Sequence, residues 1–441
     1  MSLRVPGRTM MVASVIRSLT LPNSALGFPA PQQHLLGNGC PITYLPVADA
    51  SVVCIEFWCQ AGSAMEQNTE SGIAHFLEHM VFKGNENLPP GAFDLQIESI
   101  GGSSNAATGF DEVQYHLVIP PEGLALACDL LPQLVLQPGL ERESFQMERL
   151  VVLEELSQSE DQPEEVAFQR LLHLACGNHP YGRPIIGLRS DLLNHGPADM
   201  QRFQSRHYKA ANCAVAVGGC FASDELLKML AAGPIAELDA EQDPALIDLN
   251  PDDLHMHWQP GEHHLSLPRL ESARLLIAWC APFAADPEAL MGVDLWAAAL
   301  AEGRSSRLVR VLREKLQLVE SIDVEVHPLE RGSLVILEAV TNPESLPKVR
   351  QELEKLLTQA QQGFELQEIE RAKRLIGNGY TFSHEAISQV THHLGQASLQ
   401  KRLLPLDAPL QWLKQWDQDR LHSLAKNWDL SKACILEVLP E

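Results

Sequence analysis

The chain of 441 residues lacks any apolar run of the roughly 18 residues that a membrane-spanning helix requires. It is also poor in positive charge, because 33 Lys and Arg residues stand against 57 Asp and Glu residues and give a net charge of −24 at pH 7. Phosphate backbones bind basic surfaces, so this balance argues against a nucleic-acid partner. We therefore expect no nucleic acid and no membrane among its partners.

No Cys-x-x-Cys pair occurs among the nine cysteines. An odd number of cysteines without paired spacing fits neither a disulfide framework nor a zinc knuckle. Several of them lie in apolar, strand-like stretches, where cysteine behaves as a small hydrophobic residue. We expect reduced, mostly buried thiols and a reducing compartment.

The N-terminus is poor in acidic residues, since none precedes Asp49, and Arg4, Arg8 and Arg17 make it mildly basic. This composition is typical of organelle transit peptides, although it also fits a plain N-terminal extension. We expect a soluble, cytoplasmic protein, with organelle targeting by the extension as the alternative.

The length exceeds what one hydrophobic core of ordinary size supports, so at least two domains are expected. A segment before residue 268 is rich in Asp, Glu and Pro and lacks a sustained hydrophobic period, which is typical of a linker. The predicted division is an N-terminal extension, a zinc-bearing domain, a linker and a metal-free domain, over residues 1–30, 31–240, 241–268 and 269–441.

The two halves repeat one order of expected elements. Each begins with a buried strand, continues with a helix and half-buried strands, and ends with further helices. When the halves are aligned, Gly72 falls opposite Gly292 and Glu148 falls opposite Glu370. We infer an internal duplication.

A His-x-x-Glu-His motif lies in the first half, where apolar residues recur at helical spacing from Ser71, a candidate N-cap, to Phe82. Histidines at i and i+4 lie on one face of a helix, so His75 and His79 can reach a single Zn²⁺. Glu78 lies near that face, where its carboxylate can accept a proton from the metal's water. We predict Glu78 as the general base and not as a ligand.

A third metal ligand has to come from elsewhere, because a catalytic zinc takes three protein ligands and leaves one position for water. Glu155 is the candidate, on an acidic helix expected over residues 141–158. Glu148 lies seven residues earlier on the same helix face, where it can support a ligand without binding the metal itself. We predict one Zn²⁺ per chain, held by His75, His79 and Glu155. At the aligned positions the second half carries Leu, Ala and Gly, which hold no metal.

The stretch from Ser71 to Gly84, SGIAHFLEHMVFKG, resembles the signature of the pitrilysin and mitochondrial processing peptidase family, the inverzincins. The family's third ligand is a glutamate 76 residues after the second histidine, which matches Glu155, and its accessory glutamate matches Glu148. The resemblance runs along nearly the whole chain. It implies an α+β fold of two similar domains, each an antiparallel sheet covered by helices, and zinc-dependent peptide cleavage.

The resemblance also implies substrate contacts. Asn105 and Ala106 match the family strand that pairs with an extended substrate backbone, although an ordinary strand and turn is the alternative interpretation. Arg313 matches a substrate-clamping arginine that the family follows, seven residues later, with a tyrosine. Here Glu320 stands in place of that tyrosine, which removes a hydrogen-bond donor toward the substrate carbonyl.

We therefore predict a zinc metalloendopeptidase that hydrolyses peptides or unfolded, targeting-type polypeptides. Because the clamp is incomplete, we expect a dimer, and we favour a heterodimer with a homologous, clamp-bearing subunit over a homodimer. The alternative function is that of a catalytically weak scaffold or binding subunit of a larger assembly. The four intact zinc-site residues argue against this alternative, since a scaffold has no physical need of them.

Overall fold

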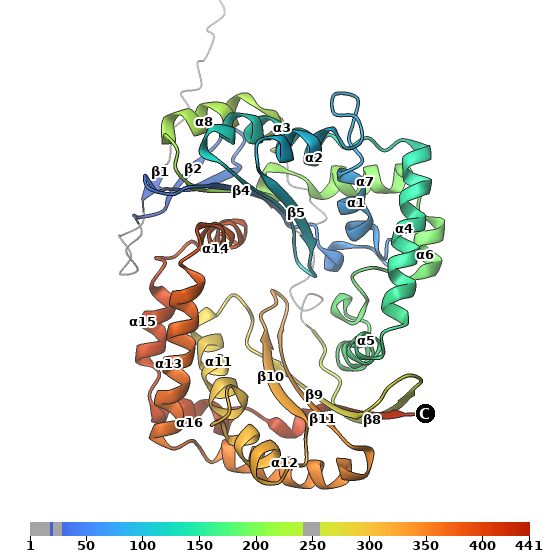
Figure 1. Cartoon of the computed structure of the whole chain (residues 1–441), viewed down its shortest axis with the longest axis vertical. Helices are drawn as coiled ribbons and strands as arrows, with labels where there is room; N and C mark the ends of the chain where they lie inside the picture. The colour runs from blue at the N-terminus through green and yellow to red at the C-terminus, as the bar shows by residue number, and fades with distance from the viewer. Residues whose placement is uncertain (1–17, 21–28, 241–255) are drawn as a thin grey trace, which may run out of the picture.

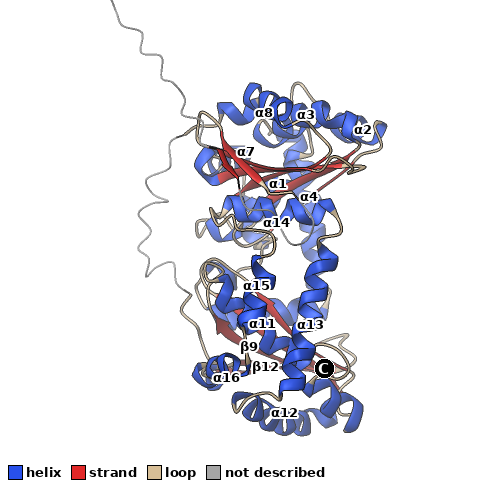
Figure 2. Cartoon of the chain, turned by 90° about the vertical axis from the view of Figure 1, so that its left-hand side faces the viewer, coloured by secondary structure: helices blue, strands red, loops and turns tan. Residues whose placement is uncertain are grey.

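The structure, a computed structural model, describes residues 18–20, 29–240 and 256–441 (Figure 1). It consists of two halves, each built on one β-sheet, and the two sheets lie in separate layers with helices between them (Figure 2). Most of the predicted N-terminal extension, and residues 241–255 of the predicted linker, lie outside the described residues. Among the residues described, no helix combines the length and the apolar character needed to cross a membrane.

The first sheet has seven strands in the order β1-β2-β3-β7-β4-β6-β5. Their bounds are β1 Ser18–Thr20, β2 Gln32–Leu35, β3 Pro41–Pro46, β4 Val53–Cys59, β5 Ser103–Thr108, β6 Val113–Ile119 and β7 Cys213–Gly219. β4 is buried along its whole length, as its apolar sequence predicts, whereas β5 is an edge strand that pairs with β6 alone. β5 and β6 form a hairpin, which accounts for the half-buried strands expected after the first helix.

The second sheet has five strands in the order β10-β11-β9-β12-β8. Their bounds are β8 Gly261–Leu267, β9 Ala273–Ala281, β10 Ser321–His327, β11 Ser333–Thr341 and β12 Cys434–Pro440. Read in reverse, this order matches β3-β7-β4-β6-β5 of the first sheet, including the single parallel pair, β8 with β12 and β3 with β7. The internal duplication is therefore confirmed by the topology.

The predicted fold class, two similar α+β domains, is confirmed in its architecture, and each sheet is mixed instead of wholly antiparallel. The parallel pair arises because the last strand of each half, β7 or β12, returns beside β3 or β8 after a long helical crossover. Residues 261–267, which the sequence analysis placed in the linker, form β8 instead. Their polar alternation concealed this half-buried strand, which pairs with β12.

The helices of the first half are α1 Ile73–Val81, α2 Ala92–Ser99, α3 Leu124–Leu136, α4 Arg142–Glu160, α5 Pro163–Cys176, α6 Arg189–Asn194, α7 Pro197–His207 and α8 Ser223–Ala232. Those of the second half are α11 Pro287–Ala301, α12 Leu346–Gln361, α13 Leu366–Ser383, α14 Ile387–Leu399, α15 Ala408–Gln415 and α16 Gln418–Asn427. In the duplication α11 occupies the place of α1, and α13 that of α4. The two helices whose bounds were predicted, over residues 71–82 and 141–158, appear as α1 and α4 with ends shifted by one or two residues.

Each sheet takes one covering helix from the other half of the chain. α14 packs against β3, β4 and β7 of the first sheet, and α5 packs against β9 and β12 of the second (Figure 1). The two halves are therefore interlocked, and their relative position does not depend on the linker alone. The nine cysteines are all free thiols, seven buried and two partly buried, as predicted.

Candidate metal centre

Helix α1 presents His75, Glu78 and His79 on one face, because its apolar residues face the core on the other. Ile73, Phe76, Leu77 and Met80 are fully buried against the first sheet and neighbouring helices, whereas the three polar residues are partly accessible. The helical period of the sequence therefore places these functional groups together.

The start of α1 is fixed by a glycine and a buried carboxylate. Gly72, not Ser71, is the N-cap, with a φ of +85° that favours glycine, and a Cβ there would lie 2.6 Å from the carbonyl oxygen of Ile186. The carboxylate of Glu66 accepts hydrogen bonds from the amides of Gly72 and Ala74, at 3.1 and 3.0 Å. These contacts satisfy amides that a helix start leaves free. Ser71 instead accepts a hydrogen bond from the amide of Leu188.

The structure brings His75, His79 and Glu155 together, although Glu155 comes from α4. One nitrogen or oxygen from each residue lies within 4.8 Å of the other two, and among the described residues they form the one group of this kind. His75 Nε2 lies 3.7 Å from Glu155 Oε1, and His79 Nε2 lies 3.4 Å from Glu155 Oε2. We call these three residues the metal cluster. Two imidazoles and one carboxylate, open on one side, are a ligand set that fits a catalytic zinc.

The electrostatics of the metal cluster favour a cation at its centre. Burial, and then the neighbouring His79, lower the pKa of His75 to about 4, so its imidazole is neutral and free to ligate. Although burial opposes the shift, hydrogen bonds with Glu148 and Glu155 raise the pKa of His79 to about 9. A hydrogen bond with His79 holds the pKa of Glu155 below its usual value. In the metal-free protein a proton on His79 thus supplies the positive charge that a metal would bring.

Glu148 lies behind His79, as predicted for a residue that supports a ligand. Its Oε1 lies 2.9 Å from His79 Nδ1, and its Oε2 accepts a hydrogen bond from Lys83 Nζ at 2.6 Å. The Glu148 side chain is buried, and both of its oxygens are occupied. This arrangement holds the His79 ring by Nδ1 and leaves Nε2 directed at Glu155.

Lys83 was missed by the sequence analysis, although it lies inside the quoted motif. It follows the end of α1, so only the fold shows that its ammonium group reaches Glu148. We expect Lys83→Met to weaken zinc binding by about tenfold, because Glu148 loses the partner that fixes its orientation. Lys83→Arg, which keeps the charge, is expected to bind zinc almost as wild type does. Competition with a fluorescent zinc chelator measures both affinities, and equal affinity for wild type and Lys83→Met would contradict the role.

Glu78 is held by Thr108 of the edge strand β5, whose hydroxyl donates a hydrogen bond to Glu78 Oε2. Burial raises the pKa of Glu78, an effect that the Thr108 hydrogen bond opposes. A carboxylate whose pKa is raised toward neutrality is a better proton acceptor than an exposed one. Thr108 therefore links the candidate general base, Glu78, to the candidate substrate-binding strand, β5.

The predicted substrate residues lie in two separate places. Asn105 is exposed on β5, where its side chain accepts a hydrogen bond from the amide of Ala106 at 2.9 Å, and Ala106 packs partly against the core. Arg313 lies on the π-helical segment Val309–Lys315 of the second half, exposed, with Nε 3.8 Å from its neighbour Glu314. Within the described part of the chain, no hydrogen bond or ion pair joins Arg313 to the metal cluster. The structure thus brings β5, but not Arg313, to the site.

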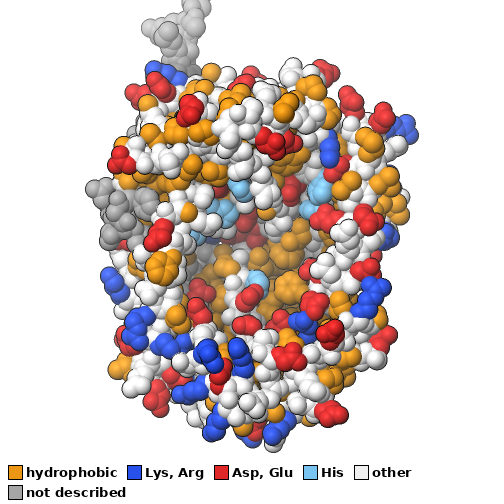
Figure 3. All heavy atoms as spheres, in the orientation of Figure 1, with side chains coloured by type: hydrophobic (Ala, Val, Ile, Leu, Met, Phe, Trp, Pro, Cys, Tyr) orange, Lys and Arg blue, Asp and Glu red, His pale blue; other side chains and the backbone are white. Residues whose placement is uncertain are grey.

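Two cavities adjoin this region. One of about 730 Å³ is lined by His75, Thr108 and Glu155 together with residues of α4 and α5. A larger one of about 880 Å³ lies between the halves and is lined by apolar side chains and by acidic ones, among them Asp111 and Glu330. Figure 3 shows the hollow at the middle of this face, with hydrophobic, acidic and histidine side chains around it.

Two protein-family models match most of the chain. The model described as insulinase (peptidase family M16) matches residues 45–189, and the model described as peptidase M16 inactive domain matches residues 196–376. The chain belongs to the peptidase M16 family. The first match contains the metal cluster and Glu78, and the second contains α11, where the aligned residues carry no titratable ligand. The resemblance predicted from the motif is confirmed.

Several M16 relatives are named as proteases. A protein of Rickettsia bellii named "uncharacterized zinc protease" is 25% identical over 365 residues, which cover 82% of this chain and 85% of that protein. A probable mitochondrial-processing peptidase subunit beta of Arabidopsis thaliana is 29% identical over 223 residues, 51% of this chain and 42% of that protein. The crystal structure of a protease from Helicobacter pylori has the same fold, with a TM-score of 0.85 and 23% identity over 94% of this chain and 100% of that one.

Proposed function

We propose that this M16 protein is a zinc-dependent endopeptidase in which His75, His79 and Glu155 hold one Zn²⁺ and Glu78 is the general base. The observation that carries the proposal is the convergence of the metal cluster from two helices, with Glu78 beside it and bonded to an edge strand. The names of the M16 relatives support a zinc protease.

When bound, zinc would lower the pKa of a coordinated water and polarise the scissile carbonyl group. The protein's own contribution begins with Glu78, whose carboxylate oxygen accepts the proton of the attacking water. The Thr108 hydroxyl fixes the orientation of that carboxylate. The same carboxyl group then returns the proton to the amine of the departing peptide, which leaves Glu78 ionised for the next cycle.

The substrate is best described as an extended polypeptide. β5 is an edge strand, so a substrate backbone can pair along its outer edge at Asn105 and Ala106, where it would replace the Asn105 side chain as the partner of the Ala106 amide. Strand addition requires an unfolded segment of substrate, because a folded domain has few free backbone groups. Peptides and unfolded or targeting-type polypeptides therefore fit the site better than compact proteins do.

A homologous partner subunit is part of the proposal. Arg313 lies on an exposed segment away from the metal cluster, and Glu320 accepts a hydrogen bond from the Ser272 hydroxyl at 3.0 Å, where the family clamp has a tyrosine. A clamp from a second chain would supply the missing donor near the scissile carbonyl. We favour a heterodimer with a clamp-bearing subunit over a homodimer.

The first experiment is hydrolysis of an unstructured, quenched-fluorescence peptide by the chain alone, loaded with one equivalent of zinc. We expect cleavage that a chelator stops and that added zinc restores. Bound zinc without cleavage would point to an absent partner, and adding that partner should then produce chelator-sensitive activity. A zinc content near zero in protein purified without chelator would instead favour the alternative, a scaffold subunit with a decayed clamp.

A further inference from the structure

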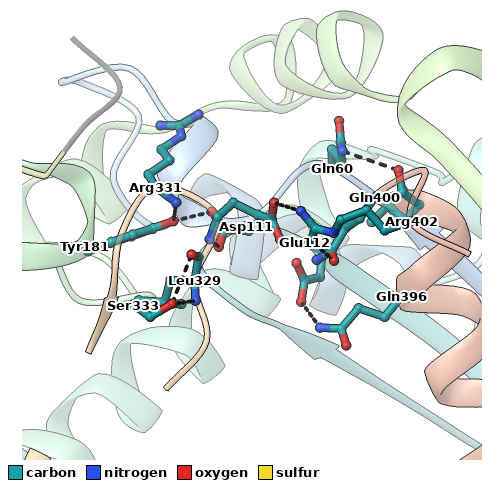
Figure 4. Close-up of polar contacts among 12 residues, drawn as sticks. Gln60, Asp111, Glu112, Tyr181, Leu329, Arg331, Ser333, Gln396, Gln400 and Arg402 are labelled. Carbon is teal, nitrogen blue, oxygen red and sulfur yellow. Dashed lines mark hydrogen bonds and ion pairs between the residues drawn. The ribbon is translucent and has the colours of Figure 1, made fainter. Parts of the chain in front are cut away.

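The turn of the β5–β6 hairpin reaches into the second half of the chain. Asp111 lies in this turn and is buried, with a relative exposure of 7%. Its Oδ1 accepts a hydrogen bond from the Tyr181 hydroxyl at 2.7 Å, and its Oδ2 accepts one from the amide of Glu330 at 3.0 Å (Figure 4). One carboxylate thus joins two segments that are far apart in the sequence.

Tyr181 follows α5, and its hydroxyl contacts both the β5–β6 turn and the segment of Glu330 and Arg331. Its hydroxyl donates to Asp111 and accepts a hydrogen bond from the amide of Arg331 at 3.0 Å. The guanidinium group of Arg331 in turn donates to the carbonyl of Ala64, beside the β5–β6 turn, at 3.2 Å. The ring of Tyr181 is fully buried, so these bonds are shielded from water.

The side chain of Glu330 is bound by a third segment of the chain, the one that follows α14. Arg402, which follows α14, donates from one guanidinium nitrogen to Glu330 Oε2 at 2.8 Å and from another to Oε1. Gln396 of α14 donates to Glu112, the neighbour of Asp111, at 3.3 Å. The turn between β10 and β11 is therefore fixed between the first-half hairpin and the end of α14 (Figure 4). Asp111, Tyr181, Glu330, Arg331 and Arg402 are called the junction below.

The junction is close in sequence to the residue that holds the candidate general base. Thr108 ends β5, bonds Glu78 and precedes Asp111 by three residues, and the amide of Gly109 closes the turn by donating to the carbonyl of Glu112 at 2.8 Å. As an edge strand, β5 pairs with β6 alone, and it also packs on α1 and α2. The buried hydrogen bonds of Asp111 and Tyr181 fix the end of this strand, beyond the last residue that pairs with β6.

We propose that the metal-free half positions β5 and Thr108 against the metal site through the junction. Asp111 and Tyr181 are then positioning residues for the edge strand, and the second half contributes to catalysis through the position of that strand. The part of this inference that concerns catalysis rests on the proposed peptidase function. The part that concerns the position of β5 does not.

The test compares Tyr181→Phe with Tyr44→Phe in the full-length, zinc-loaded protein. Both tyrosines are buried in the first half, but the Tyr44 hydroxyl donates to Gln32, at 3.1 Å, inside the first sheet and away from the junction. We expect Tyr181→Phe to accelerate amide hydrogen exchange in residues 103–112 and 328–332 by at least about fivefold, because two hydrogen bonds are lost. Tyr44→Phe should leave the exchange of both segments unchanged. Arg402→Met is a second junction variant with the same expected direction.

The activity of the same proteins gives the second readout. We expect Tyr181→Phe to lower kcat/KM for the quenched peptide by about tenfold, with an unchanged zinc content, since β5 presents both substrate and Thr108. Unchanged exchange in both junction variants would overturn the inference, and so would faster exchange with undiminished kcat/KM. If wild type itself cleaves no peptide, with or without a partner, the proposed function fails, and hydrogen exchange alone decides whether the junction positions β5.

Discussion

Replacing Glu78 by glutamine is expected to lower kcat for peptide cleavage by about a thousandfold, while one zinc per chain stays bound. General-base catalysis commonly contributes about 10²- to 10⁴-fold, and a neutral amide cannot accept the proton of the attacking water. Glutamine keeps the shape of the side chain and the oxygen that accepts the Thr108 hydroxyl, so the helix and the metal cluster should be undisturbed. The variant therefore isolates proton transfer from metal binding.

The measurement pairs initial rates on a quenched peptide with the zinc content of the same samples. Glu154→Gln is the matched control, because Glu154 precedes Glu155 on α4 but its side chain is exposed and lies outside the metal cluster. The control should keep both its zinc and its activity. Wild-type cleavage by zinc-loaded Glu78→Gln would show that another group removes the proton.

The sequence predicts most of the site because most of the site's residues lie close together on one of two helices. His75, Glu78 and His79 lie within a little more than one turn of α1, so the helical period alone puts them on one face. Glu148 and Glu155 share a face of α4 for the same reason, and the family spacing pairs that helix with α1. The structure adds the distances that bring Glu155 into reach of both histidines.

The contacts that were not predicted cross between distant segments. Nothing in the local sequence of Lys83 shows that it reaches Glu148, and nothing around Thr108 shows that it bonds Glu78. Amphipathic patterns explain why one face of α5 and of α14 is buried, but a pattern does not identify the sheet that covers it. Both helices cross to the opposite sheet. The junction of Asp111 with Tyr181 and Glu330 depends on that crossing, so the local sequence pattern could not predict it.

Removing a histidine of the metal cluster should have a larger effect on zinc than any substitution outside the cluster. We expect His79→Ala to retain no zinc after gel filtration, because two remaining ligands bind far more weakly than three. Glu148→Gln should retain zinc with an affinity lowered by about 10- to 100-fold, since it keeps every ligand and an oxygen toward His79 but loses the negative charge that pairs with His79 and Lys83. Chelator competition at fixed pH gives the two affinities on one scale.

The order of these two losses follows from what each side chain touches. His79 faces Glu155 with Nε2 and Glu148 with Nδ1, so its removal deletes a ligand and also leaves the buried Glu148 with Lys83 as its remaining partner. Glutamine at position 148 still offers an oxygen to His79 Nδ1, so the ring keeps its direction. His257→Ala, at an exposed histidine outside the metal cluster, should bind zinc as wild type does. Equal loss of zinc in His79→Ala and Glu148→Gln would mean that Glu148, and not Glu155, is the third ligand.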